Sequence, residues 1–212
     1  MIMFNEAVRW ESVPERFSSA PVEEARRRID AFFALPEEER AQTDVPPAWK
    51  LPIGEDVGAA LRVLSADRCA FCEQVIATKP YRFRPPANAR PCETASDRWS
   101  YLWWAFDWGN FYLICGRCRP LHQTHFPVDM AREAPHGLAD APLANKAEEH
   151  SIFYHPGELL APSTAFAVRG ERLEGKTTRS RETIAFFHLN RPDLGAARTA
   201  AQNAHLQALS KR

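Results

Sequence analysis

The sequence lacks both a long apolar run and a secretory signal. No stretch of its 212 residues approaches the roughly 18 consecutive apolar residues that span a bilayer. Residues 1–10 alternate apolar with charged side chains and have no basic start followed by an apolar stretch. We therefore exclude a membrane protein and expect a cytoplasmic location, where the five cysteines stay reduced and form no disulfides.

The sequence also lacks net charge, because 27 Lys and Arg side chains match 27 Asp and Glu side chains. This balance argues against a protein that binds nucleic acid only through excess positive charge. The net charge is nevertheless −5 over residues 1–67, +4 over 68–127, −4 over 128–167 and +5 over 168–212. A basic centre with acidic borders suits a site for an anionic polymer, although solvated faces without a partner give the same pattern.

Internal repeats and low-complexity tracts are missing as well, so we expect one compact body. The predicted fold class is α+β, mostly α. A helical segment is expected over residues 1–67, a cysteine-containing module over 68–127, and strands and helices that pack on this module over 128–212.

The apolar periodicity and the turn residues predict the individual elements. Val22 and Ile29 belong to one apolar stripe of the first expected helix, and Leu61 belongs to the stripe of the second. Helices are expected at residues 21–35, 55–66, 181–189 and 196–209, and short strands at 151–155 and 164–169.

Two Cys-x-x-Cys motifs carry the strongest chemical signal. A pair of cysteines at this spacing directs two thiolates at one tetrahedral ion, and two such pairs complete a structural Zn²⁺ site. The predicted ligands are Cys69, Cys72, Cys115 and Cys118, with Cys92 left over as an unliganded fifth cysteine. The 42 residues between the motifs are an inserted unit and not a simple loop. A redox role would need a thioredoxin-like βαβ context, which is not apparent in the sequence.

The sequence around these motifs matches a known family in several places. The matching segments are Cys69-Ala-Phe-Cys72-Glu73, Phe83-Arg84-Pro85, the Tyr- and Trp-rich residues 101–111, Phe126-Pro127 and Leu189-Asn190-Arg191. Together they resemble the HNH endonucleases of Septu-type and retron-associated anti-phage defence systems, over about residues 55–200. The resemblance implies a zinc-stabilised ββα module of the treble-clef type, flanked by N- and C-terminal helices. It also implies DNA as a ligand and an ABC-type ATPase, or another defence-system subunit, as a partner.

The sequence departs from this family where the chemistry takes place. In an HNH site a histidine acts as general base beside one divalent ion. The family's Glu-His falls on Tyr81-Arg82, and the Asn after its fourth cysteine falls on Arg119. A guanidinium stays protonated at physiological pH and offers no acceptor, so Arg82 cannot serve as the base. We therefore expect a pseudo-nuclease, which keeps the zinc scaffold without the catalytic centre.

An active nuclease is the alternative if His122 and His125 have taken over the catalytic metal. Three residues apart, they would share a helix face and bind Mg²⁺ or Mn²⁺ there. Asp107 and Glu93 are candidate carboxylates, but Asp107 lies in the aromatic pattern, where a structural role fits better.

Basic side chains around the altered centre are the candidates for binding nucleic acid. They are Lys79, Arg82, Arg84, Arg117 and Arg119. Forked guanidinium groups suit phosphate oxygens, which predicts DNA binding without cleavage. The spacing of the tryptophans at 99, 103, 104 and 108 favours a helix packed on the module over a stack for bases.

These observations lead to one main hypothesis and two alternatives. The main hypothesis is a nucleic-acid-binding or assembly subunit of a defence complex, with the acidic N-terminal and basic C-terminal helices as docking surfaces. The alternatives are the rearranged nuclease and a zinc scaffold that contacts only protein. Salt separates these hypotheses, since phosphate contacts weaken steeply with ionic strength and an apolar interface does not.

Overall fold

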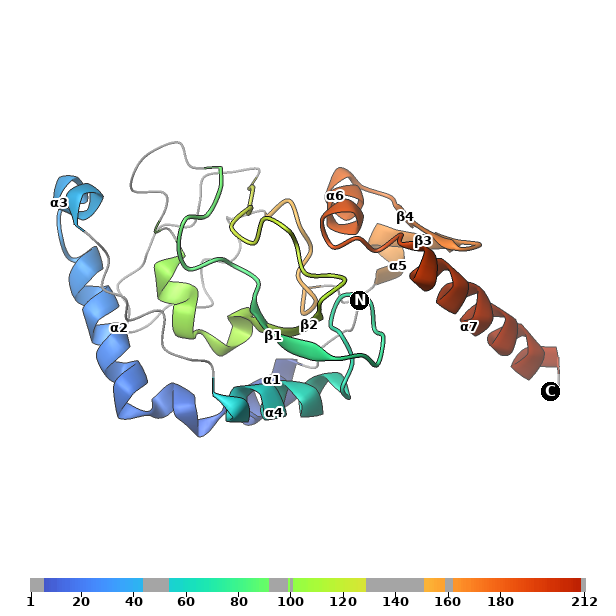
Figure 1. Cartoon of the computed structure of the whole chain (residues 1–212), viewed down its shortest axis with the longest axis horizontal. Helices are drawn as coiled ribbons and strands as arrows, with labels where there is room; N and C mark the ends of the chain where they lie inside the picture. The colour runs from blue at the N-terminus through green and yellow to red at the C-terminus, as the bar shows by residue number, and fades with distance from the viewer. Residues whose placement is uncertain are drawn as a thin grey trace.

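The computed structural model of the chain describes residues 6–43, 54–91, 99, 101–128, 151–158 and 162–210. The α-helices are α1 (Glu6–Glu11), α2 (Ala20–Phe33), α3 (Glu37–Gln42), α4 (Glu55–Ser65), α5 (Pro162–Ala165), α6 (Thr178–Phe186) and α7 (Pro192–Ser210). The strands are β1 (Thr78–Arg82), β2 (Phe111–Cys115), β3 (Phe166–Arg169) and β4 (Arg172–Gly175). Short 3-10 helices are η1 (Glu15–Ser18), η4 (Leu102–Phe106) and η5 (Trp108–Asn110). The predicted α+β class is confirmed (Figure 1).

Strands β1 and β2 form the central antiparallel pair, although 28 residues separate them along the chain. In this register Tyr81 lies opposite Tyr112, and Arg82 lies opposite Phe111. All five residues of β2 are buried, as expected from its uninterrupted apolar sequence, because such a strand is covered on both faces. Helix α4 packs against both strands and leads the chain into the first cysteine pair.

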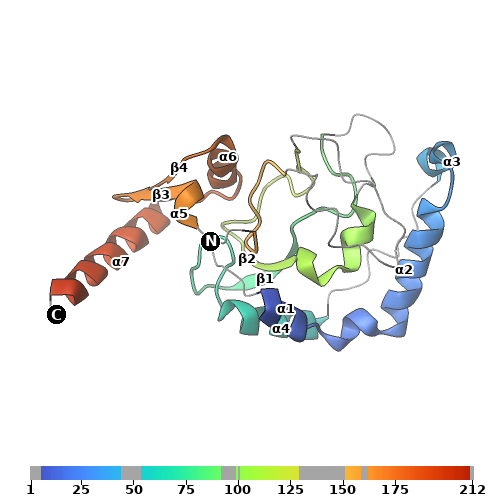
Figure 2. The ribbon, with the colours of Figure 1, turned by 180° about the vertical axis from the view of Figure 1, so that it is seen from behind.

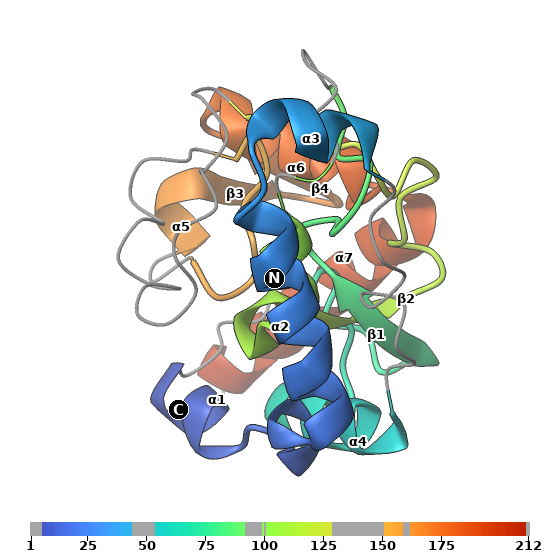
Figure 3. The same cartoon turned by 90° about the vertical axis from the view of Figure 1, so that its left-hand side faces the viewer.

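Helix α2 lies at one edge of the molecule and in front of the other elements in the view of Figure 3. It was expected at residues 21–35, and it buries the predicted stripe through Val22, Ala25, Ile29 and Phe32. This stripe packs into one cluster with residues of η4, η5 and β2, among them Trp108. The apolar face of α2 is therefore used inside the molecule, which leaves its charged face for any partner.

The aromatic segment at residues 101–110 differs from its prediction. Asp107 is extended, with φ −82° and ψ 122°, and it separates η4 from η5 where one continuous helix was expected. Trp104 and Trp108 are buried, while Trp99 and Trp103 are half-buried and pack against the hydrophobic clusters. The interpretation as core residues is thereby confirmed for Trp104 and Trp108, and Trp99 and Trp103 lie at the edge of the core.

Residue Arg9 of α1 is a fully buried charged side chain. Its Nη2 donates to the carbonyl oxygens of Trp108 and Phe111, each at 2.6 Å, and Trp108 Nε1 donates back to the Arg9 carbonyl at 2.8 Å. The guanidinium carbon also lies 4.6 Å from the centroid of the Tyr112 ring. Helix α1 is thus tied to the start of β2, about 100 residues away in sequence.

The C-terminal part contains the β3–β4 hairpin, with α6 packed on β4. The strand expected at 164–169 is found as β3, whereas residues 151–155 are not a strand, since only Ser151 bridges, to Val128. Helix α7 projects from the body at the end opposite α2 and α3 (Figure 2), and the described side chains from Ala200 onward are all exposed. Within the described ranges, no helix has both the length and the apolar character that a membrane span requires.

Candidate metal centre

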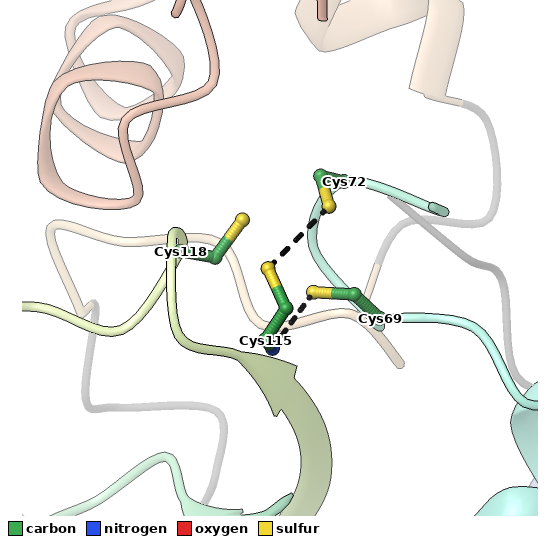
Figure 4. A group of neighbouring side chains, drawn as sticks. All are labelled: Cys69, Cys72, Cys115 and Cys118. Atoms are coloured by element: carbon green, nitrogen blue, oxygen red, sulfur yellow. Dashed lines mark hydrogen bonds between the residues drawn. The ribbon is translucent and has the colours of Figure 1, made fainter. Parts of the chain in front are cut away.

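The four predicted cysteine ligands come together in one cluster (Figure 4). Cys69 and Cys72 lie between α4 and β1, while Cys115 ends β2 and Cys118 follows it. Their sulfur atoms all lie within 4.8 Å of one another. Three of the residues are buried, Cys72 is half-buried, and all four are free thiols.

Each cysteine pair sits in a tight turn that brings its two sulfurs to the same side. In the first turn, Glu73 N donates to the Cys69 carbonyl at 2.8 Å, and Glu73 takes the left-handed φ of 63° that reverses the chain. In the second, Cys118 N and Arg119 N both donate to the Cys115 carbonyl at 3.1 Å. The hydrogen bonds of these two backbone turns therefore hold the four sulfurs close together.

The sulfur spacing fits a single tetrahedral ion. Four thiolates about 2.3 Å from a central Zn²⁺ must lie about 3.8 Å from one another. The Sγ atoms of Cys72 and Cys115 are 3.8 Å apart. Cys115 N also donates to Cys69 Sγ at 3.4 Å, a contact that stabilises a thiolate. The cluster can therefore hold a metal ion.

Hydrogen bonds among the four closely packed thiols lower the pKa values of two of them and raise those of the other two. The hydrogen bond from Cys118 lowers the pKa of Cys115 to about 6, and the one from Cys115 lowers the pKa of Cys72. The same interactions with Cys115 raise the pKa of Cys69 and of Cys118. The cluster therefore shares protons among its sulfurs, and ionisation of all four requires a cation at the centre.

The two positions where the HNH motif was expected lie on β1 and are occupied by other contacts. Tyr81 is buried beside Phe71, with ring centroids 6.0 Å apart, and burial raises the pKa of its phenol. Arg82 Nε donates to the Ala105 carbonyl at 3.0 Å, and its guanidinium carbon lies 5.0 Å from the Phe111 ring centroid. Burial lowers the pKa of Arg82 to about 10, so it remains a cation at neutral pH and offers no general base.

Arg84 lies in the core. Its side chain is 6% exposed, with the guanidinium carbon 4.7 Å from the Trp104 ring centroid and 5.7 Å from that of Phe126. The buried Asn110 fixes the backbone here by accepting from Arg84 N at 2.7 Å and donating to its carbonyl at 3.0 Å. Arg84 thus contributes to the packing of the aromatic core.

The other three basic candidates differ in their exposure. Lys79 is exposed on β1, and Arg119 is half-buried after the second cysteine pair. Arg117 is exposed and forms a 2.8 Å ion pair with Asp193 at the start of α7. Of the five residues, Arg84 is therefore buried, Arg82 and Arg119 are half-buried, and Lys79 and Arg117 are exposed.

His122 and His125 lie in a turn and not on the helix face that their spacing predicted, which corrects that expectation. His125 N donates to the His122 carbonyl at 3.0 Å, and no helix occurs in residues 116–128. Both side chains are exposed, and the His125 ring packs 5.7 Å from that of Phe186. Among the described residues, the cysteine cluster is the sole group of three or more Cys, His, Asp or Glu side chains at metal-binding distance.

The ββα arrangement that the resemblance implied is not confirmed, since β1 and β2 pair but the described residues after β2 continue as turns.

The candidates Cys92 and Glu93 lie outside the residues that the structure describes. The buried Arg9 was not predicted from the sequence, and no local signal could have indicated it, because its partners are distant in sequence. In comparisons with family models, curated proteins and solved structures, the chain matches none.

Proposed function

We propose that this chain is a zinc-stabilised pseudo-nuclease, a degenerate HNH-type module that serves as a nucleic-acid-binding or assembly subunit. The observation that carries the proposal is the state of Arg82, at the position where the HNH motif places its general base. That guanidinium donates a hydrogen bond to the Ala105 carbonyl and lies over the ring of Phe111. It remains cationic, so it would repel a catalytic divalent ion and could not activate water.

Zn²⁺ is the ion that this donor set favours. Four thiolates in a closed, tetrahedral arrangement leave no open position for water or substrate, which is the pattern of structural zinc sites. The burial of Cys69, Cys115 and Cys118 agrees with such a closed site. In this proposal the ion supplies folding free energy, and the chain's other residues supply the binding surfaces.

The proposal predicts that the zinc-loaded protein does not cut DNA. Supercoiled plasmid incubated with the protein and Mg²⁺ or Mn²⁺ is expected to stay uncut. The reason is that Arg82, a cation at neutral pH, stands where the reaction requires a general base. Agarose gel analysis beside an active HNH nuclease provides the measurement and its positive control. Metal-dependent nicking that disappears in His122→Ala would instead establish the rearranged nuclease.

Binding of DNA is expected to depend on the exposed Lys79 and the half-buried Arg119. We predict that Lys79→Glu with Arg119→Glu weakens binding to duplex DNA and reduces the slope of log affinity against log salt by roughly 0.9 for each lost phosphate contact. Arg172→Glu, which changes another exposed arginine, on β4, is the matched control.

Fluorescence anisotropy at several salt concentrations measures both quantities. Affinity that is lost in the double variant, kept in Arg172→Glu and strongly salt-dependent supports the nucleic-acid role. Undetectable binding, or binding that salt does not weaken, would leave the scaffold for protein partners as the better function.

For the assembly role, the exposed second half of α7 is the better docking surface of the two that were expected. The stripe of α2 is buried in the molecule, whereas α7 projects into solvent and exposes Leu206 and Leu209. The proposed partner is the ABC-type ATPase, or another defence-system subunit, that the family resemblance implies.

A further inference from the structure

Three contacts join the cysteine turns to residues 187–193, which follow α6 and include the start of α7. Arg191 Nη1 donates to Cys118 Sγ at 3.2 Å. Asp193 accepts from both Arg191 Nε and Arg117 Nη1, and so links the α7 start to the second cysteine turn. These contacts place one charged residue of the C-terminal part directly on a candidate metal ligand.

The third contact involves the first cysteine turn. Phe71, which lies between Cys69 and Cys72, stacks on Phe187 with ring centroids 4.0 Å apart and an interplanar angle of 22°. Both rings are buried. Because Phe187 follows α6 directly, both cysteine turns are packed against the same short stretch of chain.

The backbone of this stretch fixes where Arg191 points. Leu189 N donates to the Ile184 carbonyl at 2.9 Å, and His188 takes a left-handed φ of 52°, so α6 ends in a tight reversal. Arg198 of α7 closes the same reversal by donating to the Leu189 carbonyl. Asp193 lies in the first turn of α7, where the helix dipole favours a carboxylate.

Charge explains why this contact depends on the ion. Four thiolates around one divalent ion leave an excess of two negative charges. The guanidinium of Arg191 offsets part of this excess, and its hydrogen bond tunes the sulfur as a metal ligand. The ion also fixes the position of Cys118 Sγ, which accepts this hydrogen bond.

We infer that Arg191 is a positioning residue of the metal centre, and that the loaded centre in turn holds the reversal from which α7 projects. Binding of the ion and packing of the start of α7 against the second cysteine turn then stabilise each other. The inference rests on the proposed zinc centre. Its consequence is that the exposed half of α7 has a fixed orientation relative to the rest of the molecule only when the metal is bound.

Cobalt provides the test, because Co²⁺ occupies four-thiolate sites and its sulfur-to-metal charge-transfer bands report on each sulfur. In Arg191→Met these bands are expected to shift, and transfer of Zn²⁺ to a chelator is expected to become about tenfold faster. Arg191→Lys retains the charge and should recover part of both effects. Arg172→Met changes an exposed arginine of β4 that takes no part in the reversal, so it should leave the bands unchanged.

Hydrogen exchange of the metal-loaded protein supplies the second measurement. Amides of residues 187–199 are expected to exchange faster in Arg191→Met than in the parent, while those of α2 keep their rates. Unchanged bands and release rates in Arg191→Met would overturn the inference and leave the zinc centre standing. A parent protein that binds neither Co²⁺ nor Zn²⁺ would overturn the proposed centre and the inference with it.

Discussion

Removal of the metal is expected to unfold the centre of this protein. Structural zinc contributes about 10–16 kcal/mol in small zinc domains, which is comparable to the whole stability of a typical domain, about 5–15 kcal/mol. The cysteines belong to the same buried cluster as Phe71, Tyr81 and Tyr112. Strand β2 contributes to this cluster and to the one that covers α2, so the loss should spread to the N-terminal helices. Near-ultraviolet circular dichroism and thermal melting before and after chelation measure the effect.

A single ligand change should act like the chelator. Cys115→Ser is expected to abolish tight Zn²⁺ binding and the cooperative melting transition. Cys92→Ser is the matched control, since we expect the fifth cysteine to be unliganded, and its metal content and melting temperature should equal those of the parent. If chelation changed neither the circular dichroism spectrum nor the melting temperature of the parent protein, a structural role for the metal would be excluded.

Replacement of the buried Arg9 is expected to give the second large loss. In Arg9→Met, the carbonyl oxygens of Trp108 and Phe111 lose a charged donor at 2.6 Å. A buried acceptor without its partner costs about 1–3 kcal/mol, so we expect a loss of about 4 kcal/mol for the pair. For a chain of this size, that lowers the melting temperature by roughly 10 °C. Thermal melting of the zinc-loaded variant checks this value.

The control for Arg9 is an arginine of the same chain that makes only a surface pair. Arg27 on α2 is exposed, and its Nη2 lies 2.7 Å from Glu24 Oε2 within the same helix. Arg27→Met should therefore melt like the parent. Equal melting of Arg9→Met and Arg27→Met would mean that the α1 contacts contribute nothing to stability.

The sequence predicted those parts of the molecule that depend on local periodicity or on ligand spacing. The stripe of α2 and the four cysteines were found in this way, because each signal lies within a few residues. The histidine pair was placed wrongly, since a spacing of three residues implies a shared face only if the backbone is helical.

Other features depend on partners far away along the chain. The burial of Arg9 and Arg84 follows from carbonyl groups and aromatic rings that other elements supply, and a charged side chain is ordinarily expected at the surface. The contact of Arg191 with Cys118 spans 73 residues and likewise has no local signature.

The separation between α2 and its packing partners also governs how the newly made chain folds. The stripe residues Val22 and Ile29 pack with Trp108 and Phe111, roughly 80 to 90 positions later. At about 5–20 residues per second, the ribosome delivers those partners roughly 4 to 18 s after the stripe has left the tunnel. The contact order of this pairing is high, which favours slow folding. During translation the apolar stripe of α2 therefore stays exposed until β2, the strand that ends in Cys115, has been made.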